Sequence, residues 1–245
     1  MENTHVMVGS INDSGMLQGL RRKGFTPPKC LSELKANSID AEANNLLYSI
    51  TSLHIKMIDD GKGMKNEAIR NMFDMHKENH AGEKTRGVSG VGGKVATMVL
   101  SEEKTVMMYT KSRDGPYYSI TIPWDNMFKE GKYSGMIKMQ NMNEKEILDF
   151  HKERENMKNK DSGVTICFPY NDKLAMEIEK QFVSPNDDLE NLSFIYGGFD
   201  IIVNYKHFEK FELKQMKKYD YFGGENNKYY KGKTLETIKL YEKKK

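Results

Sequence analysis

The sequence predicts an α/β fold in which a mixed β-sheet and helices form a sandwich, rather than a doubly wound parallel sheet. The first observation is that short runs with alternating apolar residues recur along the chain, and that two pairs of these runs are close enough to form hairpins. The second is that segments with helical spacing are collected around these runs.

The expected strands span residues 46–50, 53–58, 105–109, 117–122, 163–168 and 200–205. Thr51-Ser52 separates the first two strands and predicts a tight turn. In the second strand, apolar residues at alternate positions predict one buried face, and the strand delivers Asp59 at its end.

The first expected helix opens at Thr26-Pro27-Pro28, because proline is tolerated in a first helical turn, and runs to about Glu42. Further helices are expected at 67–75, from the second glycine cluster to 100, at 144–158, at 172–181 and near 187–192. The helix at 144–158 is dense in charge and predicts a solvated face, and the rest of 125–161 is predicted to be irregular.

The domain organisation follows from composition along the chain. Residues 1–25 are polar and glycine-containing, which indicates an N-terminal arm or strap outside the core. Residues 26–205 form the main domain, and residues 206–245 are a C-terminal extension or the start of a following domain.

Composition narrows the class of protein. The chain has 245 residues with Lys+Arg 38 against Asp+Glu 35, so any basic patch must be local. Its two cysteines, Cys30 and Cys167, lie far apart and are expected to be reduced thiols. There is no apolar run of membrane-spanning length and no basic, apolar start, so we expect an intracellular protein in the cytoplasm or nucleus.

Four polar residues of the first helix share one face. At about 100° per residue, Glu33, Asn37, Asp40 and Asn44 fall within about 60° of arc. Such a stripe is often simply solvent-facing, but this one holds acids and amides without lysines. A carboxylate and an amide one turn apart suit a metal–phosphate site, with Asn37 as a ligand of Mg²⁺ and Glu33 as a general base for water.

Two glycine segments follow. Asp59-x-Gly61-x-Gly63 at a strand end is either a tight turn or a site where a carboxylate accepts from the amine of a planar base. The second segment leads into a helix, so its backbone amides predict an anion cradle, to which Lys94 adds a charge. That segment comprises Gly87, Val88, Ser89, Gly90, Val91, Gly92, Gly93 and Lys94. It is neither a Walker loop nor a Rossmann fingerprint, and a flexible hinge fits residues 82–87 better.

Together, Glu33-x-x-x-Asn37-x-x-Asp40, Asp59-x-Gly61-x-Gly63-Met64 and Gly87-x-x-Gly90-x-Gly92 resemble the three successive boxes of the GHKL ATPase superfamily. The resemblance covers roughly residues 28–205. It is closest in appearance to MORC-like and topoisomerase II-like ATPase domains.

The resemblance implies a Bergerat-type sandwich, with a mixed sheet covered by helices on one face and ATP bound between helices and loops. It assigns Glu33 as the general base, Asn37 as the magnesium ligand and Asp59 as the adenine contact. Residues 65–86 would be a lid. The implied nucleotide-binding set is Asn37, Asp40, Asp59, Gly61, Gly63, Met64, residues 87–94 and Thr165.

Thr165 is a special case within that set. The family usually has Gly-Thr at the start of a late strand, whereas this chain reads Gly163-Val164-Thr165. A shift by one residue turns a side chain to the other face of a sheet, so Thr165 reaches the nucleotide only if a bulge restores its direction.

The leading functional prediction is a slow, magnesium-dependent ATPase whose ATP-bound state closes the lid and dimerises through the N-terminal arm. The alternatives are a non-catalytic nucleotide-gated binding module and a histidine kinase-type catalytic domain. A DNA or protein client is possible for any of them; the Lys- and Tyr-rich residues 217–245 suit nucleic acid, or are simply a solvated terminus.

Overall fold

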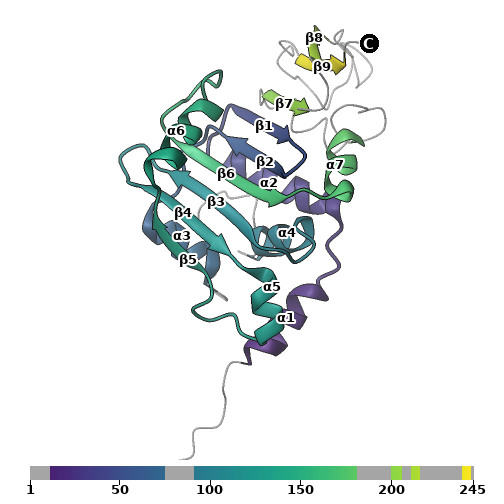
Figure 1. Ribbon diagram of the computed structural model, residues 1–245, viewed down its shortest axis with the longest axis vertical. Helices are drawn as coiled ribbons and strands as arrows, with labels where there is room; N and C mark the ends of the chain where they lie inside the picture. Colours follow the sequence, from purple (N-terminus) through teal and green to yellow (C-terminus); the bar gives the residue numbers. More distant parts are fainter. Residues whose placement is uncertain (1–11, 75–90, 181–199, 206–210, 216–238, 244–245) are drawn as a thin grey trace, which may run out of the picture.

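The computed structural model describes residues 12–74, 91–180, 200–205, 211–215 and 239–243. Its central sheet has seven strands in the order β5-β4-β3-β6-β2-β1-β7 (Figure 1). These strands are β1 (Asn45–Ile50), β2 (His54–Asp59), β3 (Val106–Lys111), β4 (Tyr117–Ile122), β5 (Lys138–Asn141), β6 (Gly163–Pro169) and β7 (Asp200–Tyr205). Among these described strands only the β1–β7 pair is parallel, so the sheet is mixed, as predicted.

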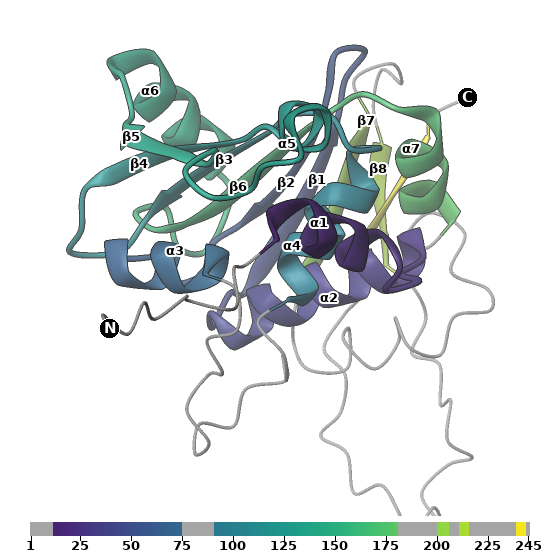
Figure 2. The ribbon, with the colours of Figure 1, turned by 90° about the horizontal axis from the view of Figure 1, so that it is seen from below.

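The helices of the described residues are α1 (Asp13–Arg21), α2 (Pro27–Asp40), α3 (Asn66–Phe73), α4 (Gly92–Leu100), α5 (Trp124–Glu130), α6 (Glu144–Glu153) and α7 (Asp172–Ile178). Figure 2 shows α2, α3 and α4 on one side of the sheet and α6 on the other. The predicted two-layer α/β sandwich is therefore confirmed, with α6 as an addition on the opposite face. Separately, β8 (Phe211–Gln215) and β9 (Lys239–Lys243) pair as a two-stranded sheet.

Helix α2 forms where the sequence predicts it and ends slightly earlier. Pro27 and Pro28 occupy its first turn, and Leu31 and Leu34 are buried against the core. After Asp40 the chain leaves the helix through Glu42, which has a left-handed φ of 59°. The amide of Ala43 then donates to the carbonyl of Ser38, a hydrogen-bond pattern that closes helix C-termini.

Helix α1 corrects the prediction that residues 1–25 lie outside the core, as far as the described residues 12–25 are concerned. Leu17 and Leu20 are 1% and 2% exposed and belong to the core. The side chain of Arg21 forms an ion pair with Glu103 and stacks 3.8 Å from the ring centroid of Phe128. This segment is thus packed on the domain by both apolar and charged contacts.

The segment predicted to be irregular contains two further elements. Helix α5 buries Trp124 and Met127 and ends at Gly131, whose left-handed φ of 61° makes it a helix C-cap. Strand β5 is an exposed edge strand, so its residues carry no alternating apolar pattern. The helix predicted near 187–192 lies outside the described residues.

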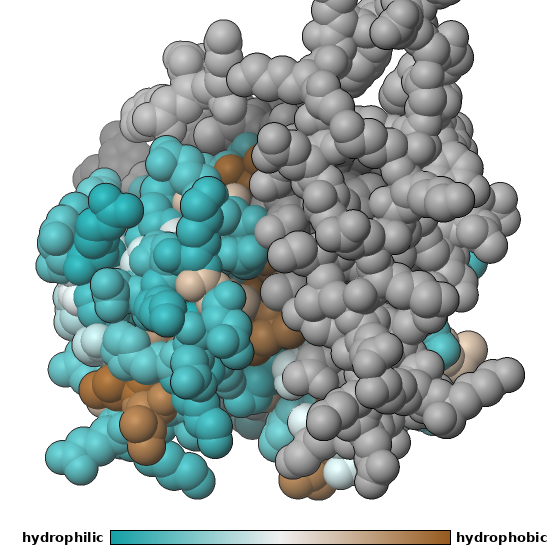
Figure 3. All heavy atoms as spheres, turned by 90° about the horizontal axis from the view of Figure 1, so that it is seen from above, coloured by the Kyte–Doolittle hydropathy of each residue, from teal (hydrophilic) through white to brown (hydrophobic). Residues whose placement is uncertain are grey.

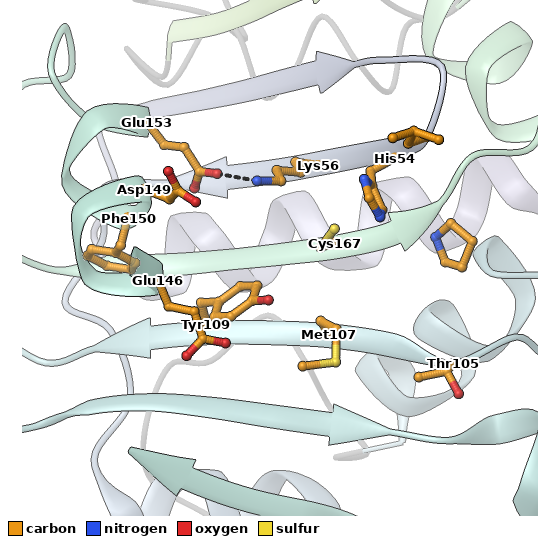
Figure 4. A pocket seen from close by; sticks show the side chains of 12 residues that line it. His54, Lys56, Thr105, Met107, Tyr109, Glu146, Asp149, Phe150, Glu153 and Cys167 are labelled. Atoms are coloured by element: carbon orange, nitrogen blue, oxygen red, sulfur yellow. Dashed lines mark hydrogen bonds and ion pairs between the residues drawn. The ribbon is translucent and has the colours of Figure 1, made fainter. Parts of the chain in front are cut away.

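Side chains alternate between the two faces of the sheet along β2, β3 and β6. Met57, Met108 and Ile166 point toward α2, α3 and α4. Their neighbours Lys56 and Cys167 point the other way, and Figure 4 shows them on the same face of the sheet as α6. There they line a hollow of about 270 Å³.

The surface matches the composition of the chain. In Figure 3 the described part of the visible face is mostly hydrophilic, with separate small apolar patches. Among the described residues, the large apolar side chains with high exposure are Leu53, Leu148 and Met176. Within the same residues, no helix combines the length and apolar character that a membrane span requires.

Candidate functional site

A cavity of about 360 Å³ lies between the sheet and helices α2, α3 and α4. Most of its polar side chains come from α2 and from the end of β2, its floor comes from the central strands, and α3 forms one wall and adds Asn71. The principal lining residues are Glu33, Asn37, Ser38, Asp59, Met64, Asn71, Met72, Gly92, Gly93, Met108, Val164 and Ile166. Three helices and three central strands thus converge on one space.

Glu33 and Asn37 lie one helical turn apart on α2 and both face the first turn of α4. A Cβ at Gly92 would collide with the Glu33 carboxylate, and one at Gly93 would lie 3.5 Å from the Asn37 amide nitrogen. The absence of a side chain at Gly92 therefore lets the α4 backbone approach Glu33 directly, and Gly93 leaves open the space beside Asn37. The unpaired amides of a helix N-terminus attract anions, so this corner suits phosphate groups.

Asp59 ends β2 and turns its carboxylate toward the cavity. Its Oδ1 accepts hydrogen bonds from the amides of Gly61 at 3.0 Å and Val164 at 3.1 Å. Its Oδ2 accepts one from the Ser38 hydroxyl at 3.2 Å. These bonds fix the carboxylate, and the second oxygen has spare acceptor capacity for a ligand.

Burial raises the pKa of Asp59 above its ordinary value, because a charged carboxylate loses its hydration inside the protein. The charge of Arg154 and the hydrogen bonds from Gly61, Val164 and Ser38 oppose this shift. The ionisation of Asp59 therefore depends on its protein neighbours.

The adjacent Asp60 has a different role. Its Oδ1 accepts from the amides of Asn44 and Asn45, both at 2.7 Å, and its Oδ2 accepts from the amide of Asn159 at 3.2 Å. Asp60 is 1% exposed and ties the start of β1 to the loop before β6. Of the two neighbouring acids, only Asp59 lines the cavity.

The turn after Asp59 needs glycine at Gly63. Its φ is +64°, and a Cβ there would collide with the carbonyl of Lys111. The next amide, that of Met64, donates to the Thr110 hydroxyl at 2.9 Å, and that hydroxyl donates to the carbonyl of Gly163 at 3.0 Å. This chain of contacts places Met64 against the cavity.

The structure brings together most, but not all, of the predicted site residues. Glu33, Asn37, Asp59, Gly63, Met64, Gly92 and Gly93 line the cavity. Asp40, Gly61, Val91, Lys94 and Thr165 do not line it, although Gly61 supports Asp59 through its amide. Gly87, Val88, Ser89 and Gly90, together with residues 75–86 of the predicted lid, lie outside the described residues.

Thr165 faces away from the cavity. Strand β6 pairs residue by residue with both neighbours, with Thr165 opposite Ile58 on β2 and opposite Tyr109 on β3, so no bulge changes its direction. The Thr165 hydroxyl instead donates to Glu153 of α6 at 3.0 Å. Thr165 therefore does not belong to the predicted nucleotide-binding set. Because the strand register is unbroken, its side chain lies on the face of the sheet opposite the cavity.

Lys94 is a buried member of α4. It is 1% exposed, and burial lowers the pKa of its ammonium group to about 8, while the charge of Asp74 acts in the opposite direction. Lys94 is the third residue of α4, within its first turn, and it does not line the cavity.

Several lining residues are absent from the set predicted by sequence. On α3, Ala68, Asn71 and Met72 have the i, i+3, i+4 spacing of one helix face, which is a readable signal once α3 is known to cover the cavity. Ser38 and Val164 carry no such signal, because their roles depend on contacts with Asp59 across 21 and 105 residues of sequence.

Comparison with known proteins agrees with this geometry. No curated protein sequence matches the chain. The family of histidine kinase-, DNA gyrase B-, and HSP90-like ATPases matches residues 25–163, which is more than half of the chain and includes every residue named for the cavity except Val164 and Ile166. The chain therefore belongs to the histidine kinase-, DNA gyrase B-, and HSP90-like ATPase family, the GHKL superfamily, whose domains bind ATP.

Proposed function

We propose that this chain is a magnesium-dependent ATPase domain that hydrolyses ATP to ADP and phosphate. The observation that carries the proposal is that Glu33, Asn37 and Asp59 line one cavity together with the glycine-lined first turn of α4. An acid able to activate water and a helix N-terminus able to hold phosphates are thus adjacent.

Each residue has a role in this proposal. Asp59 accepts a hydrogen bond from the exocyclic amine of adenine, while its other contacts keep the carboxylate in place. Gly92 and Gly93 let the phosphates approach the α4 backbone. Glu33 takes the proton from the water that attacks the terminal phosphate.

Asn37 fits a magnesium ion that arrives with the triphosphate. Among the described residues, no three His, Cys, Asp or Glu side chains are grouped as a metal site. Magnesium in nucleotide sites takes few protein ligands, and the Asn37 side-chain oxygen adds one without adding negative charge. When bound, the ion neutralises charge on the phosphates.

We also propose that ATP binding drives a conformational switch. Helix α3 contributes Asn71 and Met72 to the cavity and leads into the remainder of the predicted lid, residues 65–86. Lid closure over ATP would then favour dimerisation through the N-terminal arm, in service of a DNA or protein client. The buried, unpaired Cys30 and Cys167 fit a reducing intracellular setting.

The test is a comparison of ATP binding and phosphate release by wild type, Glu33→Ala and Asp59→Asn. We expect Glu33→Ala to bind ATP but release no phosphate, and Asp59→Asn to lose binding while staying folded, since asparagine retains an Oδ1 for Gly61 and Val164. Wild type that binds ATP without releasing phosphate would instead identify a nucleotide-gated module. Absence of ATP binding by wild type would contradict the proposal as a whole.

Dimerisation is checked separately, by measuring molar mass in solution with and without a non-hydrolysable ATP analogue. A mass that doubles only with the analogue supports the switch. A mass that never changes removes dimerisation from the proposal and leaves ATP hydrolysis standing.

A further inference from the structure

Arg154 contacts Asp59 from outside the cavity. It caps the C-terminus of α6, on the opposite face of the sheet, and is 0% exposed. Its Nε donates to the backbone carbonyl of Asp59 at 3.0 Å, and its Nη1 donates to the carbonyl of Phe150 at 3.1 Å. Its guanidinium group also lies 3.6 Å from the ring centroid of Phe150, so it is held from three directions.

The sheet is shaped to admit this side chain. Gly163, at the start of β6, has a φ of +141°, and a Cβ there would lie 2.9 Å from the Arg154 Nε and would collide with the Asp59 carbonyl. Figure 4 shows the neighbouring α6 residues Phe150 and Glu153 above the same face, with Glu153 bonded to Lys56. Arg154 therefore passes from α6 to the end of β2 through a space that only glycine leaves open.

Arg154 supplies the positive charge next to Asp59. The groups that act on the Asp59 carboxylate are the Ser38 hydroxyl of α2, the Val164 amide of β6, the Gly61 amide of the turn and Arg154 of α6. Among these described groups, Arg154 is the cation, and the charges of Asp59, Glu153 and Asp60 act on it in turn. Burial lowers the pKa of Arg154 to about 10, so it remains charged at neutral pH.

We propose that Arg154 is a positioning residue for nucleotide recognition, which holds the Asp59 carboxylate in its charged form and fixes the end of β2. The inference rests on the proposed adenine-binding role of Asp59. A charged carboxylate accepts the amine hydrogen bond strongly, whereas a protonated one is a poorer acceptor and offers a competing donor. Helix α6 on one face of the sheet thereby helps to set the affinity for a ligand bound on the other.

The test is the pH dependence of ATP binding by wild type, Arg154→Gln and Arg154→Lys, measured with a fluorescent ATP analogue between about pH 5.5 and 8.5. We expect the midpoint of binding to move to higher pH in Arg154→Gln, with affinity falling about tenfold per pH unit below that midpoint. Arg154→Lys should restore most of the wild-type profile, because it keeps the charge. Titration of the phosphates is common to all the proteins and cancels in the comparison.

Lys56→Met is the matched control, since it removes another cation beneath α6 that pairs with Glu153 rather than with Asp59. Its binding profile should overlay that of wild type. Equal midpoints in Arg154→Gln and wild type, with both folded, would overturn the inference, as would an equal shift in Lys56→Met. Failure of wild type to bind ATP would instead contradict the proposed function.

If Arg154→Gln does not fold, the inference is tested by the number of protons that wild type releases on binding ATP. Calorimetric titration at about pH 8 in two buffers of different ionisation enthalpy measures protons released on ATP binding. No release supports a carboxylate already charged in the free protein. Release of about one proton, unchanged in Arg154→Lys, would show that Asp59 must ionise on binding and would overturn the inference.

Discussion

The charged side chains on the two faces of the central sheet differ in whether they form ion pairs with other described residues. On the cavity face, neither Glu33 nor Asp59 takes part in an ion pair with another described residue. On the face beneath α6, the Lys56 ammonium lies 2.6 Å from Glu153, which also accepts from the Thr165 hydroxyl. Acids facing the cavity thus keep capacity for a ligand, whereas Lys56, Glu153 and Thr165 on the opposite face satisfy one another.

The largest expected effect separates two glutamates, one on each face. Glu33→Gln should lower the rate of phosphate release by roughly 10²- to 10⁴-fold, because an amide cannot act as a general base. Glu153→Gln should leave that rate within about twofold of wild type, since the new amide oxygen still accepts from Thr165. Steady-state phosphate release with saturating ATP checks both, and a similar loss in the two variants would break the comparison.

The next effect comes from the first turn of α4. Gly92→Ala would place a methyl group where the Glu33 carboxylate lies, and displacement of that side chain should lower phosphate release by roughly 10²-fold. The control is Gly19→Ala in α1, where a Cβ meets nothing within 4 Å. That variant should stabilise the fold by roughly 0.5–1 kcal/mol and keep full activity. An active Gly92→Ala would show that Glu33 does not need its present position.

A third prediction concerns Asp59 and pH. Because burial raises its pKa, the folded state binds a proton more readily than the unfolded state, whose ordinary value is 3.8. This contribution to stability is present below about pH 3.8 and is lost as the pH rises through the folded pKa. The free energy of unfolding of Asp59→Asn, relative to wild type, should therefore increase from about pH 3.5 to neutrality.

Denaturant unfolding at a series of pH values measures that difference. A difference that is flat with pH would mean that the surroundings of Asp59 fully compensate for its burial. A difference that decreases with pH would mean that they overcompensate, and it would contradict the expected direction of the pKa shift.

The smallest expected effect is on the face beneath α6. Lys56→Met removes a partly exposed ion pair with Glu153 and should cost about 0.2–1 kcal/mol of stability. Phosphate release should not change. Thermal unfolding and activity together check this, and a large loss of activity would show that charges beneath α6 reach the cavity by a route other than Arg154.

The parts of the site that sequence could predict are those fixed by local geometry. Glu33 and Asn37 are one turn apart on a single helix, and Asp59 is the last residue of a strand, so periodicity places each on its element, while the family resemblance indicated that they share one site. The alternation of side chains along a strand likewise explains why Thr165, in the absence of a bulge, points away from the cavity. Local rules of helix and strand geometry carry this information.

The parts that could not be predicted depend on contacts between distant residues. Arg154 belongs to a charge-dense helix that the sequence indicated as a solvated face, yet it is 0% exposed and bonds to a residue 95 positions away. Helix α1 was assigned to an arm because its sequence is polar, and its two buried leucines become significant only when α5 is beside them. No local pattern encodes such tertiary partners.

The backbone conformation and close contacts of Gly163 limit which residues position 163 can accept. A side chain at this position would strike the Asp59 carbonyl and crowd Arg154, so its effects would reach both faces of the sheet at once. In a library randomised at position 163 and selected for folding alone, without ATP, we expect glycine to be recovered almost exclusively. Mutational tolerance at this position is therefore limited by the backbone itself, before any requirement of activity is applied.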